Sequence, residues 1–244
     1  MTNRILQKGC CIKLTNIIDS DLEIWVKWLN DSNLTANLQS VTQGAIHTIT
    51  TQKKYIRDEI KKGRIFLVAR NFENLPLGIL SLTDITYSSA HFTIFFGATY
   101  RDKPLLPLEA TALLVQYAFN KLEFKRLEGG TRLNGLKGYV NRLCVIGFLP
   151  DGIKMDSWVK RDLVEPTIQF SITRLFFDEL CSRRGGHLWP NDDYITKVLA
   201  TFKELSAEKF NYITDQYIKS FTDLNNSHKS LLLDADNFTA QKLV

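Results

Sequence analysis

The segment Ala90–Glu128, AHFTIFFGATYRDKPLLPLEATALLVQYAFNKLEFKRLE, contains the change of pattern from which the fold is inferred. The segment begins inside SAHFTIFFGAT (residues 89–99), a short apolar run that predicts a strand. PLEATALLVQYAFNKL then places apolar residues at helical spacing and predicts a helix. FKRLEGGTRL predicts a second strand after it. The segment therefore predicts a strand, a loop, a helix and a strand in succession.

The surrounding sequence extends this pattern in both directions. Upstream, SDLEIWVKWLND and TTQKKYIRDEIKKG predict two amphipathic helices joined by a polar loop. RIFLVAR and LPLGILSLTDIT predict two strands that join SAHFTIFFGAT as an antiparallel group. Downstream, GLKGYVNRLCVI predicts a helix and TIQFSIT a strand. The order of elements predicts an α/β (α+β) domain with a mixed, mainly antiparallel sheet flanked by helices.

The regular apolar pattern ends after Leu180, where the segment CSRRGGHLWPNDD contains two glycines and a proline. We therefore expect one domain over residues 1–180 and a helical C-terminal extension over residues 181–244. The extension carries an apolar stripe at helical spacing, which needs a partner surface. We expect it to fold back on its own domain, to mediate dimerisation or to bind another protein.

Composition narrows the class of protein. The net charge of +5 is spread along the chain, so nucleic-acid binding is not required, while an anionic, phosphate-bearing cofactor would suit it. No apolar run approaches the roughly 18 residues of a membrane span, and no cleavable leader is evident. We expect a cytoplasmic protein. The four cysteines form no CxxC pair, so neither disulfides nor a metal is expected.

Several segments in their order resemble the GCN5-related N-acetyltransferases, or GNAT superfamily. The resemblance covers roughly Ile12 to Arg174 and is strongest to the branch of ribosomal-protein alanine, spermidine and amino-sugar N-acetyltransferases. The segments that carry it are DLEIWVKWLND, LPLGILSL, AHFTIFFGATYRDK, LEATALLVQYAFNKLEFKRLE, and NRLCVIGF followed by DGI.

The resemblance implies a site for acetyl-CoA or another acyl-CoA as co-substrate. In the family, the strand that matches HFTIFFGAT splays from its neighbour through a bulge and binds the pantetheine arm, which implies contacts at Phe96 and Gly97. The pyrophosphate lies on the N-terminus of the next helix, which here starts near Leu106. Asn134 matches a family asparagine that touches the cofactor.

The pyrophosphate loop departs from the family pattern. Arg101 begins the loop as the family does, but four bulky residues replace the small ones, namely Pro104, Leu105, Leu106 and Pro107. Each proline removes a backbone N–H donor. Pro107 nevertheless suits the first turn of a helix. We expect Arg101 and Lys103 to hold the phosphates by charge instead.

The family's chemistry needs a base for the amine and an acid for the departing thiolate. His91 lies where relatives carry an acidic residue, and its ordinary pKa near ~6.5 suits a base. Leu143 replaces the family's acid, a tyrosine, and Tyr139 lies one helical turn earlier as the substitute candidate. Asp84 and Trp28 are the expected contacts to the acceptor.

Three functions remain open at this level. The first is an N-acyltransferase that acts on a primary amine of a small molecule, an amino sugar or a protein. The second is a GNAT-fold binding or scaffold protein that has lost CoA, favoured by the proline-containing loop and the missing tyrosine. The third is an acyltransferase supplied by an acyl carrier protein, whose single phosphate makes smaller demands on the loop.

Overall fold

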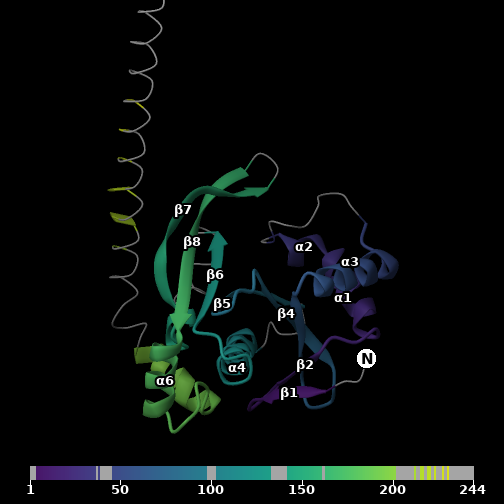
Figure 1. Cartoon of the computed structure of the whole chain (residues 1–244), viewed down its shortest axis with the longest axis horizontal. Coiled ribbons are helices and arrows are strands. Elements are labelled where there is room, and N and C mark those ends of the chain that lie inside the picture. Colours follow the sequence, from purple (N-terminus) through teal and green to yellow (C-terminus); the bar gives the residue numbers. More distant parts are fainter. Residues whose placement is uncertain are drawn as a thin grey trace, which may run out of the picture. The chain divides into compact units, whose positions relative to one another are not determined.

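A mixed sheet forms the centre of the fold in the computed structural model (Figure 1). The structure describes residues 4–36, 38, 46–97, 103–132, 142–160 and 163–201, with single helical residues between 212 and 230. Within these residues the sheet has eight strands in the order β1-β2-β3-β4-β5-β6-β8-β7. The strands are β1 (Ile5–Lys8), β2 (Lys13–Asn16), β3 (Ile65–Arg70), β4 (Pro76–Thr83), β5 (Ser89–Phe96), β6 (Arg126–Arg132), β7 (Leu149–Lys160) and β8 (Leu163–Thr173).

Neighbouring strands are antiparallel except for the central pair, β5 and β6, which is parallel. A parallel pair needs a crossover connection, and α4 (Leu106–Asn120) supplies it. The other helices with defined bounds are α1 (Asp21–Leu29), α2 (Ser32–Thr35), α3 (Ile49–Lys61) and α6 (Arg174–Arg183). The α/β fold class predicted from the sequence is thus confirmed.

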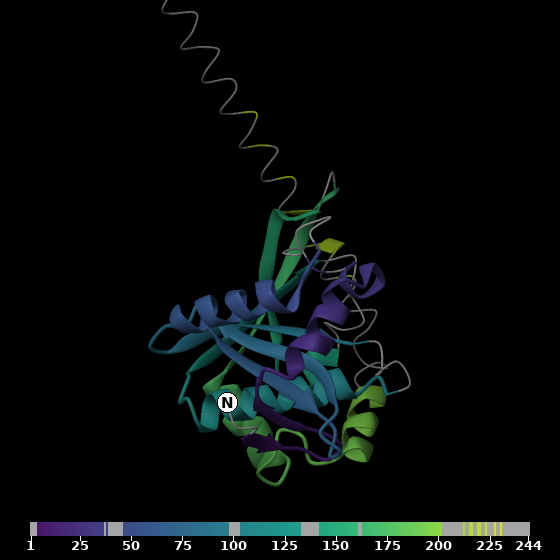
Figure 2. The same cartoon turned by 90° about the vertical axis from the view of Figure 1, so that its right-hand side faces the viewer.

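Helices cover both faces of the sheet (Figure 2). α1 and α3 pack on β4 and β3, whereas α4 packs on β1, β2 and β5 from the opposite face. α3 starts with a capping box in which Thr48 and Thr51 exchange side-chain and backbone hydrogen bonds. α4 is buried on most sides, which explains why its sequence is apolar almost throughout.

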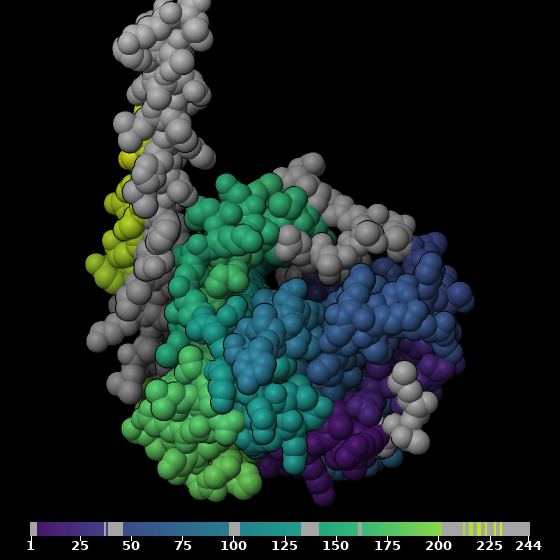
Figure 3. Space-filling view, viewed as in Figure 1, coloured from purple at the N-terminus to yellow at the C-terminus, as the bar shows by residue number. Residues whose placement is uncertain are grey.

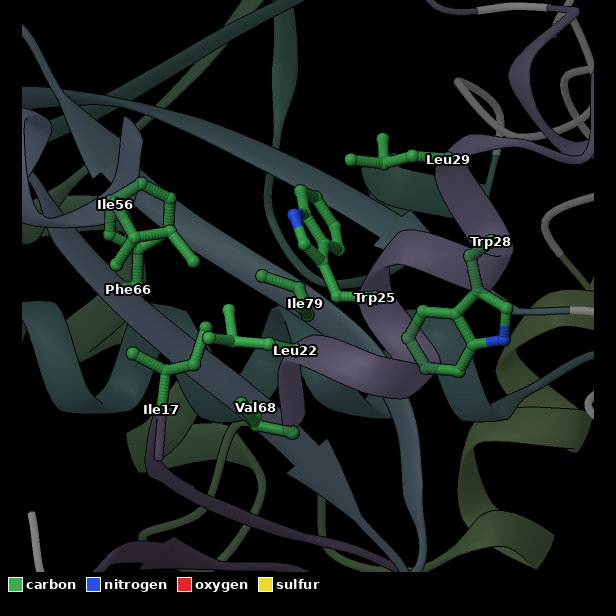
Figure 4. Close-up of a cluster of buried hydrophobic side chains, with 9 residues drawn as sticks. All are labelled: Ile17, Leu22, Trp25, Trp28, Leu29, Ile56, Phe66, Val68 and Ile79. Carbon is green, nitrogen blue, oxygen red and sulfur yellow. The ribbon is translucent and has the colours of Figure 1, made fainter. Parts of the chain in front are cut away.

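One hydrophobic cluster lies between α1, α3 and the sheet (Figure 4). Trp25 is fixed in it by a hydrogen bond, because its Nε1 donates to Gln52 Oε1 at 2.9 Å. The buried members of the cluster are Ile17, Leu22, Trp25, Trp28, Leu29, Ile56, Phe66, Val68 and Ile79. The cluster anchors α1 beside β4 and β5.

An aromatic cluster packs on the other face. The ring of Phe92 lies 5.0 Å from that of Phe148 and 5.9 Å from that of Phe170. Gly129 leaves the room for it, because a Cβ at this glycine would collide with Phe92 and Phe170. The packing of these rings over Gly129 therefore holds β5, β6 and β8 together near Phe92.

The chain forms two units, Met1–Leu199 and Ala200–Val244. The boundary predicted after Leu180 lies within α6, inside the first unit. Residues beyond it are well packed in this unit, since Trp189 is 5% exposed and Ile195 is fully buried. In the second unit the described residues are helical. In the described part of the chain, no helix combines the length and apolar character that a bilayer crossing requires.

Candidate functional site

The central feature of the site is the short pairing of β5 with β6. The two strands pair at three positions only, from Ser89 opposite Arg126 to His91 opposite Glu128. Both strands then continue, β5 as far as Phe96 and β6 as far as Arg132, with no further pairing between them in the described residues. The sheet therefore opens after His91, in the direction of α4.

Packing on α1 holds the second half of β5 away from β6. The ring of Phe95 makes edge contacts with Trp25 at 5.7 Å and with Trp28 at 6.3 Å. Gly97 lies directly against the Trp28 indole, where a Cβ would collide with the ring, and its N–H donates to Leu77 O at 2.9 Å. Trp28 therefore fixes the end of β5.

β6 is held on its other side by β8, with which it pairs over its whole length. The opening thus comes from two strands that are each bound to a different neighbour. The resemblance to the family implied a bulge in β5, but the β4–β5 ladder runs from Thr83–His91 to Gly78–Phe96 without a register shift. The bulge is therefore not present in this part of the strand.

The β7–β8 hairpin forms one wall beside the opening. It is long and curved in Figure 1, and Figure 3 shows the surface hollowed between this green hairpin and the blue residues of α3 and its neighbouring strands. Near the hairpin's tip, Lys160 Nζ donates to the carbonyl oxygens of Thr35 at 2.7 Å and Ala36 at 2.8 Å. The hairpin and the end of α2 are thereby joined.

α4 starts on the far side of the opening from His91. Leu105 is its N-cap and makes no side-chain cap hydrogen bond, and a proline lies in the first turn, as predicted for Pro107. Lys103 is exposed just before the helix, whereas Leu106 is buried. The uncapped start of a helix and a nearby cation are both favourable to an anion.

His91 lies at the closed end of the opening, on the α1 face. It shares this face with Thr93 and Phe95, because side chains at alternate strand positions point to the same side. Burial lowers the pKa of His91 below its ordinary value of 6.5, and the charges of Asp84 and Glu128 partly oppose this effect. The imidazole is therefore held in its neutral, proton-accepting form at neutral pH.

Two carboxylates, those of Asp84 and Glu128, lie close enough to His91 to act on its charge. Asp84, predicted from the sequence, is exposed in the turn after β4, with its Oδ2 accepting from Thr83 Oγ1 at 3.2 Å. Glu128, which sequence reasoning missed, is the register partner of His91 and accepts from Arg126 Nε at 2.6 Å. A signal was available, because Glu128 is an acidic residue inside the predicted strand that follows the helix.

The other predicted site residues fall into three groups. Phe96, Gly97, Lys103 and Leu106 lie at the α4 end of the opening, and Trp28 is buried beside Gly97. Arg101, Asn134 and Tyr139 lie outside the described residues. Leu143 is fully buried. Burial raises the pKa of Cys144 to about 11, so its thiol stays protonated at neutral pH and is a poor nucleophile.

Glu109 lies in the first turn of α4, where an acidic side chain commonly interacts with the helix dipole. Its carboxylate instead accepts hydrogen bonds from the backbone N–H groups of Cys10 at 2.6 Å and Cys11 at 3.0 Å, in the turn between β1 and β2. Desolvation raises the pKa of this carboxyl above its usual range. The residue therefore joins α4 to the N-terminal hairpin.

No family model and no curated protein matches the sequence. Solved structures do: spermidine N-acetyltransferase from Vibrio cholerae in complex with CoA and spermine matches with a TM-score of 0.61 and 14% identity, over 69% of this chain and 99% of that chain. An acetyltransferase of the GNAT family from Bacillus anthracis matches with a TM-score of 0.58 and 13% identity, over 68% and 97% of the two chains. The chain has the fold of these acetyltransferases.

Proposed function

We propose that this protein is an N-acyltransferase, which transfers an acetyl or other acyl group from acyl-CoA to a primary amine of a small molecule, an amino sugar or a protein. The observation that carries the proposal is the opening between β5 and β6, closed at His91 and facing the start of α4 at its other end. An extended ligand with an anionic end fits such an arrangement.

In this proposal the pantetheine arm lies along the free side of β5. A strand edge offers backbone N–H and C=O groups that can pair with amide groups of the arm. From His91 to Phe96 the strand spans about 17 Å, at roughly 3.3 Å per residue. The thioester would then lie near His91, and the phosphates near Lys103, Arg101 and the first turn of α4. A neighbour of the same fold is in complex with CoA, which supports acyl-CoA as the ligand.

His91 acts as the base in the proposed reaction. It takes a proton from the acceptor ammonium, directly or through water, and the free amine attacks the thioester carbonyl carbon. A C–N bond forms, the C–S bond breaks and the thiolate leaves with the bonding electron pair. Tyr139 is the candidate that returns a proton to the thiolate, and Asn134 the candidate for a further contact to the cofactor.

The two carboxylates near His91 favour a cationic acceptor. Asp84 is exposed, and Glu128 is partly exposed despite its ion pair with Arg126. Opposite charges near an ammonium group raise its local concentration and orient it. The Vibrio cholerae neighbour is a spermidine N-acetyltransferase in complex with CoA and spermine, which supports a cationic amine as acceptor without naming this protein's own acceptor. Trp28 would act indirectly, because its ring fixes the position of Gly97 at the end of β5.

The test is an acyl-transfer assay with acetyl-CoA and a panel of polyamines, amino sugars and peptides with free N-termini. We expect thiol release that depends on the amine, and a loss of about 10²–10⁴-fold in kcat for His91→Ala. His187→Ala is the matched control, because His187 is an exposed histidine in the segment after α6.

Two outcomes would contradict the proposal. Absence of transfer to every amine, with CoA failing to bind, would favour the scaffold function. Transfer from an acylated carrier protein but not from acyl-CoA would favour the carrier-dependent enzyme. Full activity of His91→Ala would remove His91 as the base while leaving acyl transfer intact.

A further inference from the structure

A second polar cluster lies away from His91, where the N-terminal hairpin, α4 and the segment after α6 come together. Its centre is the side chain of Glu109, which is 1% exposed. Oε1 accepts the two N–H bonds from Cys10 and Cys11. Gly9 permits this close approach, since a Cβ there would collide with Oε1. The carboxylate is thus held by the turn itself.

The second oxygen of Glu109 is left without a hydrogen-bond partner by the described residues. Oε2 is buried and makes no hydrogen bond within the described part of the chain. A buried carboxylate oxygen without a partner costs free energy, so such an atom calls for a ligand or a proton. The groups that act on this carboxyl are the backbone N–H groups of Cys10, Cys11 and Ile12 and the charge of Asp192, and no arginine or lysine forms an ion pair with it among the described residues.

Two further residues with metal-ligating groups lie close to the Glu109 carboxylate. Cys11 Sγ donates to Asp192 Oδ2 at 3.4 Å, and ligand atoms of Cys11, Glu109 and Asp192 all lie within 4.8 Å of one another. Asp192 is oriented by Trp189, whose Nε1 donates to Oδ1 at 3.0 Å. The Cys10 thiol is directed elsewhere, to the carbonyl of Pro190 at 3.5 Å.

We propose that Cys11, Glu109 and Asp192 form a zinc-binding site, with water as the fourth ligand. Zinc takes sulfur at about 2.3 Å and carboxylate oxygen at about 2.0–2.2 Å in tetrahedral geometry. These lengths place a sulfur and an oxygen ligand about 3.6 Å apart, close to the observed Cys11–Asp192 separation. A thiolate among the ligands disfavours Mg²⁺ and Ca²⁺, which prefer oxygen alone.

The ion would connect three segments that are distant in sequence. Glu109 lies 98 positions and Asp192 181 positions from Cys11. Such spacings carry no motif, which is why the cysteine pattern gave no sign of a metal. Since Glu109 belongs to the first turn of α4, the ion would also fix the start of this helix.

The test uses the full chain, stripped with a chelator and kept reduced. Titration with ZnCl₂ against a chromophoric chelator should show one equivalent of zinc bound, with Mg²⁺ and Ca²⁺ unable to compete. Cys11→Ser and Asp192→Asn should each weaken zinc binding by about 100-fold or more. Cys181→Ser is the matched control, because this thiol is free and the charges that act on it, Asp178, Arg184 and Arg174, do not belong to the cluster.

Cobalt substitution gives an independent readout. Co²⁺ should produce a thiolate charge-transfer band in the original chain and in Cys181→Ser, but not in Cys11→Ser. His91→Ala should bind zinc unchanged, so the metal site and the acyl-transfer proposal can fail separately. Absence of a stoichiometric ion, or unchanged binding in a correctly folded Cys11→Ser or Asp192→Asn, would overturn the proposal. Far-ultraviolet circular dichroism establishes that each variant is folded.

Discussion

At the scale of single residues, the environment of His91 determines its chemistry. Desolvation lowers its pKa, so the neutral form persists to a lower pH than for a histidine in water. If His91 is the base, kcat/KM should be flat near pH 7 and fall on acidification through a pKa below 6.5. His91→Gln should remove this acidic limb from the measured pH profile. An unchanged limb in the variant would assign the titration to another group.

Gly97 is a position where even a small side chain should disturb the structure beside the opening. Gly97→Ala places a methyl group against the buried Trp28 ring, so we expect a loss of about 1–3 kcal/mol in the free energy of unfolding. Gly152→Ala is the control, because a Cβ there meets nothing within 4 Å. Urea unfolding measures both. Equal midpoints for the two variants would contradict the close contact between Gly97 and Trp28.

Sequence alone predicted some of these residues and not others. His91 was proposed from the family resemblance, at the start of an apolar strand, and Asp84 from its place after the preceding strand. Glu128 could not be linked to His91, because their pairing depends on a parallel register between strands separated by α4. The burial of Trp28 against Gly97 likewise depends on how α1 packs on β5, which the helical spacing of α1 does not specify.

At the scale of elements, the proposed function places the phosphates of acyl-CoA at the start of α4. Its first turn lacks the glycines that the resemblance leads us to expect, so in this proposal binding depends more on charge than on backbone donors. Lys103→Ala should therefore weaken CoA binding by about fivefold, near 1 kcal/mol. Lys121→Ala is the matched control, since Lys121 is exposed at the opposite end of the same helix.

Calorimetry at low salt measures this difference, because salt screens exposed charges. An equal affinity for both lysine variants would contradict the assignment of Lys103 to the phosphates.

The elements with strong periodicity were predicted well, whereas the irregular ones were not. α1, α3, α4 and β3 to β5 were all predicted within a few residues of their observed bounds. β7 was missed because its sequence, LPDGIKMDSWVK, contains proline, glycine and aspartate, which are poor strand formers. Its pairing with β8 outweighs these local preferences. β1 and β2 are only four residues each, too short for a clear alternation.

At the scale of the whole molecule, a buried ion pair connects the N-terminal region to the sheet. Arg70 Nη2 donates to Asp21 Oδ2 at 2.6 Å, with both side chains at most 3% exposed, and Arg70 Nε donates to Thr15 Oγ1. Asp21→Ala leaves the guanidinium buried without its anion. We expect a loss of about 3–5 kcal/mol in the free energy of unfolding.

Lys53 and Asp19 form the comparison pair, because their side chains are far more exposed. Asp19→Ala should leave the urea midpoint almost unchanged, because an exposed ion pair is screened by solvent. Similar losses for Asp19→Ala and Asp21→Ala in urea unfolding would contradict the difference in burial.

The extent of the first unit predicts where the chain can be shortened. A chain that ends at Thr201 keeps Trp189 and Ile195 in place, so it should fold and retain the melting temperature of the unit. A chain that ends at Leu180 cuts α6 and removes both side chains, so it should melt earlier or aggregate. Circular dichroism melting and size-exclusion chromatography test this. Equal stability of the two truncated chains would favour the boundary first predicted at residue 180.

The central claim is that the opening between β5 and β6 binds acyl-CoA, and isothermal titration calorimetry with acetyl-CoA and with CoA tests it most directly. We expect one site per chain with a Kd in the micromolar range, and a stabilisation of about 2.7 kcal/mol at a ligand concentration of 100 times Kd. Absence of heat and of any thermal shift at millimolar CoA would contradict the account.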